Sequence, residues 1–496
     1  MSKKKKGNYS TLKQHKQSGK TLTPPLASLP NMNSSSWRDE RMPDVLWAVL
    51  LTSALPRDEY LSYFRLVVDA AYKSDLKMGI LHSDGAKLTE RQFDSLFAPL
   101  FADAGVLNAL TPLLLFENLP DRQHWMRHLT LLDYEQALQS LAQAVARTLD
   151  HQSEASTDCR WLKLVFMMAA GMMQMPTELA RPIIGFPRIG DMRSVRPSIR
   201  AAEIALSSMP DKEQNQWPAA FWKECWDKTD CVPAPQREPE SGQAEGVARQ
   251  LIELYALVGD HFFSVCETTD INPRLDAVFG MVLYGINLAM TLNHGTAHRR
   301  VEGRLAIRTL TEIVITLSFL LKRDNPNLWQ KFRSHGSGQA KLTFLKMIDF
   351  ESELPDYIDL DEIEMFANED IWQEFTSIEL GNWAGMDLRK MSEEAGLIDV
   401  YDKYYGWPSG YVHGQWGALR DTVFDLCLNP LHRYHRIPSL PKRLMGSVAI
   451  DALHLVNMLL DSLNMAYPSF KSRVKKPGPA KSEAPLDSDK EGSVEG

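Results

Sequence analysis

An aromatic, glycine-rich segment that contains one histidine carries the strongest chemical signal in the sequence. It begins at Tyr401, reads YDKYYGWPSGYVHGQWG, and places Tyr405, Ser409 and His413 four residues apart. An imidazole can act as a general acid or base near neutral pH, and rings at this density can stack on nucleic-acid bases. A loop packed with aromatic side chains, in which His413 is a hydrogen-bonded core histidine, explains the same pattern equally well.

A second group of polar residues has helical spacing. Arg304, Arg308 and Glu312 stand at i, i+4 and i+8 and therefore share one face of a helix. The strongly apolar sequence after Glu312 favours partial burial of the pair, which then needs further polar partners. We therefore expect the His413 ring to lie within hydrogen-bonding distance, or one water, of the Arg308–Glu312 pair.

Metal and cofactor chemistry have weaker support. His294, His298 and Glu302 also stand at i, i+4 and i+8, but Gly295 weakens a helix there, and exposed polar side chains explain them better. The cysteines are odd in number and lack any C-x-x-C spacing, which favours reduced thiols without a zinc or disulfide framework; they are Cys159, Cys225, Cys231, Cys266 and Cys427. The prediction is no metal and no cofactor.

Common catalytic motifs are absent from the sequence. It contains no G-x-x-x-x-G-K-[ST] phosphate loop, no G-x-G-x-x-G after a strand, no H-E-x-x-H and no G-x-S-x-G. Nucleotide-driven and hydride-transfer chemistry therefore have no support from a motif.

The composition is that of a folded globular protein. The chain has 496 residues, of which 44% are hydrophobic and 24% charged, and its length predicts two or three domains. A formal net charge of −8 argues against a protein coated in nucleic acid, although a local basic groove would not change that sum.

Helical periodicity dominates the middle of the chain. Thr89 and Gln92 form a capping-box pattern, and segment 161–175 is apolar nearly all round. Further helical patterns cover 133–149, 247–261, 275–292, 305–321 and 445–463. No alternation strong enough for a sheet is present, so the predicted fold class is all-α.

The predicted domain organisation follows composition. Residues 1–36 are polar and basic and predict a flexible arm, for which a solvated tail is favoured over a nucleic-acid-binding one. A helical domain over 37–232 precedes a Pro- and charge-rich linker at 233–246. A second helical domain, a bundle, covers 247–470, and a disordered tail follows at 471–496.

Membrane association is not expected. The lysines at 3–6 are not followed by an apolar segment, and no run of about 18 apolar residues exists anywhere in the sequence; the longest candidate is 313–321. These features predict a cytoplasmic protein.

Two of these motifs carry a resemblance. Arg308-Thr-Leu-Thr-Glu312, followed by Tyr405, Ser409 and His413-Gly414, resembles a widespread, uncharacterised family of bacterial helical proteins with Arg-x-x-x-Glu and Ser-x-x-x-His-Gly helices, similar to HEPN-type domains. The resemblance covers about 250–465 and implies a HEPN-like bundle. HEPN nucleases cleave RNA without metal through Arg-x4-6-His on one helix. This sequence departs from that pattern, since Arg420 follows His413, and Arg308 would have to supply the cation.

Two functional hypotheses follow. In the first, the protein is an antiviral-defence effector or toxin that acts on RNA or a nucleotide: His413 is the acid or base, Arg308 holds phosphate and Glu312 orients Arg308. Tyr405, Ser409 and Arg304 then position the substrate, in a metal-independent, ribonuclease-like reaction. In the second, the protein is a non-catalytic interaction or sensor module, with a protein partner or a second copy, and the cluster is structural. Exposure of His413 and Arg308 in a cleft would favour the first.

Overall fold

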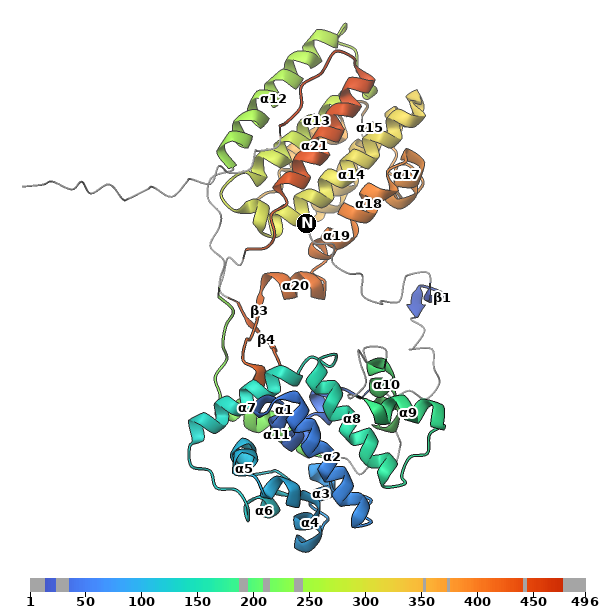
Figure 1. Cartoon of the computed structure of the whole chain (residues 1–496). Helices are drawn as coiled ribbons and strands as arrows, with labels where there is room; N and C mark the ends of the chain where they lie inside the picture. Colours follow the sequence, from blue (N-terminus) through green and yellow to red (C-terminus); the bar gives the residue numbers. More distant parts are fainter. Residues whose placement is uncertain are drawn as a thin grey trace, which may run out of the picture. The chain divides into compact units, whose positions relative to one another are not determined.

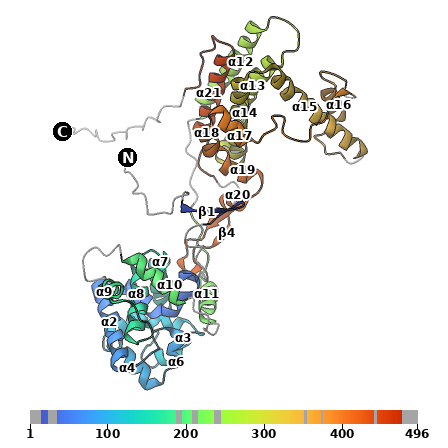
Figure 2. The same cartoon turned by 90° about the vertical axis from the view of Figure 1, so that its right-hand side faces the viewer.

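The computed structural model describes residues 14–23, 35–186, 195–207, 215–235, 244–350, 354–372, 375–439 and 444–475. The chain divides into two compact units. Unit 1 comprises Met1–Ala234 and Leu426–Ile437, and unit 2 comprises Pro235–Asp425 and Pro438–Gly496. The described residues are mostly helical with two small two-stranded sheets, which confirms the all-α prediction (Figure 1, Figure 2).

Unit 1 is built around one helix that is buried over most of its length. Every residue from Leu46 to Thr52 in α1 (Leu46–Ala54) is buried, and the Trp47 ring packs edge-on against Phe64 and Phe97. The capping box predicted at Thr89 and Gln92 is present at the start of α4. The surrounding elements are η3 (Trp37–Arg41), η4 (Pro43–Val45), α2 (Arg57–Lys73), α3 (His82–Gly85), α4 (Glu90–Phe101), α5 (Ala104–Leu110), η5 (Thr111–Leu115), α6 (Arg122–Trp125), α7 (Tyr134–Thr148), α8 (Glu154–Ala169), α9 (Thr177–Gly185), α10 (Arg196–Ser207), α11 (Trp217–Lys228) and η10 (Pro430–His432).

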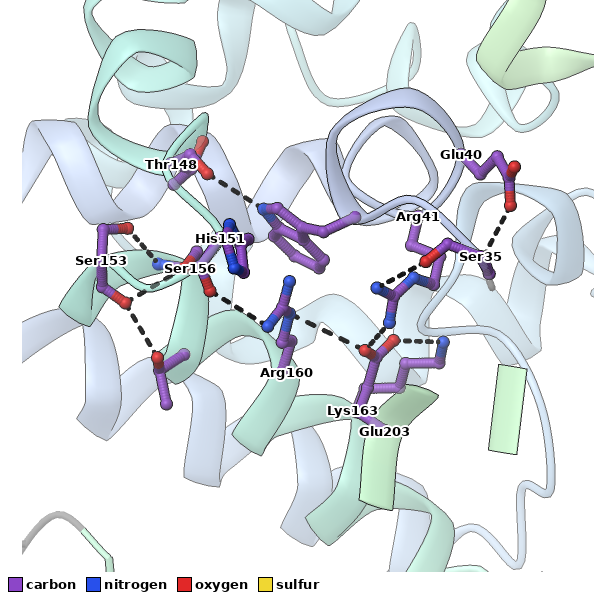
Figure 3. A network of polar contacts seen from close by, with 12 residues as sticks. Ser35, Glu40, Arg41, Thr148, His151, Ser153, Ser156, Arg160, Lys163 and Glu203 are labelled. Carbon is purple, nitrogen blue, oxygen red and sulfur yellow. Dashed lines mark hydrogen bonds and ion pairs between the residues drawn. The ribbon is translucent and has the colours of Figure 1, made fainter. Parts of the chain in front are cut away.

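A buried polar cluster lies inside unit 1, with a single carboxylate at its centre. Glu203 on α10 forms ion pairs with Arg41 of η3 and with Arg160 and Lys163 of α8 (Figure 3). Burial alone would raise the pKa of Glu203, but Lys163, Arg41 and Arg160 outweigh it and hold that pKa below its usual range. The Arg160 guanidinium lies 4.5 Å from the centre of the Trp37 ring, and burial lowers its pKa to about 10. The cluster therefore links η3, α8 and α10.

Short strands occur in two places. β1 (Lys16–Ser18) pairs antiparallel with β2 (Thr21–Thr23), in register Lys16 to Thr23, inside the segment predicted to be a flexible arm. The rest of that arm, 1–13 and 24–34, lies outside the described residues. β3 (Phe424–Leu426) pairs with β4 (Arg436–Pro438).

Unit 2 is a bundle in which α13, α14 and α21 pack against one another, with α12 against α13 (Figure 1). Gly285 permits close approach of α13 and α21, because a Cβ there would lie 2.4 Å from Cδ1 of Leu459. The elements are α12 (Ala244–Val265), α13 (Pro273–Leu292), η7 (Ala297–Arg299), α14 (Val301–Arg323), α15 (Pro326–Met347), η8 (Ile348–Phe350), α16 (Leu360–Ala367), α17 (Leu388–Ala395), α18 (Ile398–Tyr404), α19 (Gly406–Val412), α20 (Trp416–Thr422) and α21 (Ala449–Ala466).

Helix α13 is longer and more apolar than the sequence analysis expected of any segment. Its 20 residues are long and apolar enough to cross a membrane by length and composition, although Asn287 and Gly280 interrupt the strictly apolar run. In the structure 56% of its apolar window is buried, and α12, α14 and α21 pack against it. The buried hydrophobic residues of α13 belong to the hydrophobic core of unit 2. A cytoplasmic location stays a prediction.

The ordered C-terminal end extends beyond the predicted boundary at 470. The Asn457 side-chain amide donates to the carbonyl oxygen of Val474 at 3.0 Å and accepts from its N–H at 2.9 Å. Val474 is buried in the core of unit 2. Residues 471–475 are therefore part of the fold, and the rest of the predicted tail, 476–496, lies outside the described residues.

The boundary between domains also differs in one respect from the predicted organisation. Leu426–Ile437, which the sequence prediction placed in the C-terminal bundle, belongs to unit 1. Leu431 in this segment is buried in the core of unit 1. Most of the predicted linker at 233–246 lies outside the described residues, so its character stays a prediction.

Candidate functional site

The Arg308–Glu312 pair contacts the aromatic segment through Tyr405. Nη2 of Arg308 lies 3.0 Å from Oε1 of Glu312, one turn along α14, and Nη1 donates to Oε2 at 3.1 Å. Nη2 also donates to the Tyr405 hydroxyl at 3.2 Å, and the guanidinium lies 5.1 Å from the centre of the Tyr405 ring. Two of the predicted site residues thus meet a third that is 97 residues away in sequence.

The pair is partly buried, as its sequence context indicates. The Arg308 side chain is 20% exposed and that of Glu312 34%. Burial raises the pKa of Glu312, against the opposing effects of the Arg308 charge and a hydrogen bond with Tyr405. Tyr405 also stacks on Tyr401 with ring centres 4.8 Å apart. The cluster therefore fastens α14 to the start of α19, and of the Arg308 nitrogens only Nε is buried without a hydrogen-bond partner among the described residues.

Arg304 belongs to a different polar group, although it precedes Arg308 by one turn. Its Nη2 donates to the carbonyl oxygen of Gly446 at 2.7 Å. Burial lowers the pKa of Arg304, while Tyr411 and Asp421 act in the opposite direction. The Tyr411 hydroxyl in turn donates to Asp421 at 3.0 Å. Arg304 is thus held by unit 2 itself, and its predicted role in substrate binding stays a prediction.

His413 lies apart from the pair, and the direct contact expected from the sequence is not made. Its backbone N–H donates to Ser409, whose own N–H donates to the carbonyl oxygen of Tyr405, so the three residues follow one helix face. Two turns of helix separate Tyr405 from His413, a rise of roughly 12 Å. His413 is exposed, and within the described residues its side chain forms no hydrogen bond or ion pair. Tyr405 takes the place beside Arg308 that the sequence analysis gave to His413.

The two short helices around His413 expose apolar side chains. Trp407 is 60% exposed and Trp416 61%, and Val412, Leu419 and Val423 are also exposed. We call these five residues the α19–α20 face. The nearby Arg420 has its charge paired with Asp421 at 2.9 Å. The face is therefore aromatic and aliphatic rather than cationic.

The alternative set of metal ligands does not form one helix face. His298 lies in η7, Glu302 begins α14, and His294 precedes both in a turn where Gly295 has a φ of +55°. Burial lowers the pKa of His298. The break at Gly295 is the physical reason that the i, i+4, i+8 spacing does not bring these three side chains onto one continuous helix.

Sequence reasoning missed two features of unit 1. One is a group of two cysteines and two histidines that lie close together although the cysteines lack any C-x-x-C spacing. The other is a cavity of about 1250 Å³ whose lining includes Arg41, Lys163 and Trp222. Because Arg41 and Lys163 pair with Glu203, these cations do not make the cavity an anion site.

The contacts of Arg308 predict a graded loss of stability in unit 2. Tyr405→Phe removes the hydroxyl that forms hydrogen bonds with Arg308 and Glu312, and it should lower the free energy of unfolding by about 1 kcal/mol. Arg308→Gln leaves Glu312 partly buried without its cation and should lower it by about 1–3 kcal/mol. Chemical denaturation measures both. Arg389→Gln, at a side chain that is 54% exposed, is the control and should change it by less than about 0.5 kcal/mol. Equal effects of Arg308→Gln and Arg389→Gln would contradict the view that Arg308 holds α14 and the start of α19 together.

Comparison with known proteins locates these residues but names no activity. Residues 285–427 match a family of unknown function, DUF5677. No curated protein and no solved structure matches the chain. The matched range holds all six candidate residues, Arg304, Arg308, Glu312, Tyr405, Ser409 and His413. The chain is therefore similar to this family over the part of unit 2 that carries the candidate site.

Proposed function

We propose that unit 2 is a non-catalytic interaction module, in which the Arg308–Glu312–Tyr405 cluster is structural and the α19–α20 face binds a protein partner. The observation that carries the proposal is the use of Arg308: its guanidinium already bonds Glu312 and Tyr405. A phosphate approaching Arg308 would have to displace the Glu312 carboxylate, which repels it. Arg308 is thus poorly placed to hold a substrate phosphate.

The character of the α19–α20 face supports a protein partner rather than a nucleic acid. Binding to RNA relies on cations that contact the backbone together with rings that stack on bases. Here Trp407 and Trp416 supply rings, but the nearby Arg420 is paired with Asp421. Exposed aromatic and aliphatic side chains on neighbouring helices are typical of a surface that another protein covers.

A second candidate function keeps the RNA hypothesis, and one observation favours it. His413 is exposed, its side chain forms no hydrogen bond or ion pair within the described residues, and it lies between helices with exposed tryptophans. Such a histidine is free to act as an acid or base. In this alternative the protein is a HEPN-like antiviral effector or toxin of the cytoplasm that cleaves RNA without metal.

One experiment with two measurements separates the candidates. A photoreactive phenylalanine analogue is placed at Leu419, on the α19–α20 face, or at Leu380 as a control, which is 87% exposed elsewhere in unit 2. Irradiation in cells should give a discrete protein adduct from position 419 that Trp416→Ser abolishes, and none from position 380. In parallel, the purified full chain is incubated with a labelled single-stranded RNA in chelator, and no cleavage is expected.

The opposite results would overturn the proposal. RNA cleavage in chelator that His413→Ala abolishes, with an unchanged melting temperature, would establish the nuclease. An adduct at position 419 that contains RNA, or the same adducts at positions 419 and 380, would show that the α19–α20 face is not a specific protein-binding surface.

A further inference from the structure

Four side chains with the chemistry of metal ligands converge within unit 1. They are Cys231, from the segment after α11, and Cys427, His432 and His435, from the segment that follows β3. Cys231 and His432 are 201 residues apart in sequence. One ligand atom from each of the four lies within 4.8 Å of all the others.

The distances between sulfur and nitrogen fit a tetrahedral centre. Sγ of Cys231 lies 3.4 Å from Nδ1 of His432 and 3.3 Å from Nε2 of His435, and Sγ of Cys427 lies 3.7 Å from Nδ1 of His432. Zinc bonds of about 2.3 Å to sulfur and about 2.0–2.1 Å to nitrogen, at the tetrahedral angle, place the two atoms about 3.5 Å apart. The four atoms are thus spaced as the corners of one coordination shell.

The surroundings orient the ligands as they are oriented in metal sites. Nε2 of His432 lies 3.1 Å from the carbonyl oxygen of Thr229, which fixes the ring with Nδ1 turned toward the two sulfurs. A metal-bound histidine commonly donates its other ring N–H to such a carbonyl. Backbone contacts hold Cys427: Pro233, two residues after Cys231, pairs with Cys427 in an antiparallel bridge, and the N–H of Cys427 donates to the carbonyl oxygen of His435 at 2.9 Å.

The turn between the two histidines adopts an unfavourable backbone conformation. Arg433 and Tyr434 have φ angles of +55° and +52°, a region that side-chain-bearing residues rarely adopt in succession. This turn brings His435 back beside Cys231. A bond from His435 to a metal would give the strained turn a stabilising partner.

We propose that Cys231, Cys427, His432 and His435 bind one structural Zn²⁺. Two thiolates and two imidazoles form the Cys₂His₂ set that zinc occupies with tetrahedral geometry. Four protein ligands leave no open position for a substrate, so the ion is structural rather than catalytic. The site is in unit 1 and is independent of the function proposed for unit 2.

The ion would fasten a distant part of the chain to unit 1. Pro235–Asp425 lies between the first ligand and the other three, so the metal closes a loop that contains most of unit 2. Segment Leu426–Ile437 is also held by the burial of Leu431 and by the ion pair of Arg433 with Asp39. Loss of the metal should therefore loosen this segment without unfolding the core of unit 1.

Metal content of the full chain tests the proposal. The chain, expressed with zinc and purified in reducing buffer without chelator, should carry one equivalent of Zn²⁺ by elemental analysis. Replacement by Co²⁺ should give the visible absorption of a tetrahedral, thiolate-bound ion. Cys427→Ser should weaken zinc binding by more than about 10-fold in a chelator competition. Cys266→Ser, at an exposed cysteine outside the group, should leave binding unchanged.

Hydrogen exchange gives a second measurement that does not depend on any variant. Removing zinc from the wild-type chain should speed exchange in peptides covering 426–437, while peptides from α1 stay protected. Wild-type protein without zinc, and with no Co²⁺ absorption on reconstitution, would overturn the proposal. A Cys231–Cys427 disulfide that persists in reducing buffer would do the same, as would equal zinc binding by Cys427→Ser and Cys266→Ser.

Discussion

Replacing Glu203 with glutamine should lower the free energy of unfolding of unit 1 by about 3–5 kcal/mol, because it removes the carboxylate that pairs with three buried cations. The side chain of Glu203 is fully buried, and glutamine has nearly the same shape, so the loss is electrostatic rather than a loss of packing. Hydrogen-exchange protection of peptides from α1 and α8 measures the change. Peptides from α13 and α14 in unit 2 should keep their protection.

A matched control separates burial from charge. Glu90→Gln removes a carboxylate that also pairs with an arginine, Arg127, but whose side chain is 74% exposed. Exposed ion pairs contribute about 0–1 kcal/mol, so this variant should stay within that range. Similar losses for Glu203→Gln and Glu90→Gln would contradict the view that Glu203 is the electrostatic centre of unit 1.

The same residue makes the effect depend on pH. The three cations hold the folded-state pKa of Glu203 below its ordinary value of 4.5, so its carboxylate stabilises the fold above about pH 4.5. That contribution is lost as the pH falls through the lowered folded-state pKa. The stability difference between wild type and Glu203→Gln should therefore be full at neutral pH and shrink in acid. The comparison with Glu203→Gln is needed because another buried carboxyl group has the opposite dependence on pH. Burial raises the pKa of Asp158, although Arg57 and Tyr60 act to lower it. Both proteins contain Asp158, so its effect cancels in the difference.

Local pattern predicted the helices of this protein well because their causes are local. The Thr89–Gln92 capping box joins residues only three positions apart, so the two residue types at that spacing are enough to predict it. The i, i+4 spacing of Arg308 and Glu312 likewise required only a continuous helix. At Gly295, where the sequence analysis expected a weakened helix, the same i, i+4 spacing does not give a continuous helix face.

Long-range partners could not be read from the sequence. Glu203 bonds residues near positions 41 and 160, and nothing in the spacing of α10 distinguishes a buried glutamate from an exposed one. Cys231 and Cys427 meet only because the chain returns to unit 1 after residue 425. A short Cys-x4-His-x2-His run at 427–435 was the one local signal for that group. The sequence analysis expected His413 beside Arg308 because an imidazole can act as an acid or base. In the structure the Tyr405 hydroxyl lies beside Arg308 instead.

In unit 2 the largest effect is expected at the contact between α13 and α21. Leu459→Ala should lower the free energy of unfolding by about 2–5 kcal/mol, because Leu459 is fully buried and its removal leaves a cavity against α13 and α14. Met465→Ala is the control on the same helix; its side chain is 66% exposed, and the loss should stay below about 0.5 kcal/mol. Chemical denaturation gives the size of the loss, and protection of α13 peptides assigns it to unit 2.

A second substitution, Gly285→Ala, tests the same contact, because its effect on stability should change sign when Leu459 is replaced. In the wild-type background Gly285→Ala places a methyl group 2.4 Å from Cδ1 of Leu459 and should destabilise by about 1–3 kcal/mol. With Leu459→Ala that atom is gone, and the methyl group fills part of the cavity while alanine favours the helix by about 1 kcal/mol over glycine. Gly285→Ala should then stabilise the protein. The two changes should be coupled by more than about 1 kcal/mol in a double-mutant cycle. If Gly285→Ala had the same effect in both backgrounds, the Leu459 side chain would not be the reason that position 285 requires glycine.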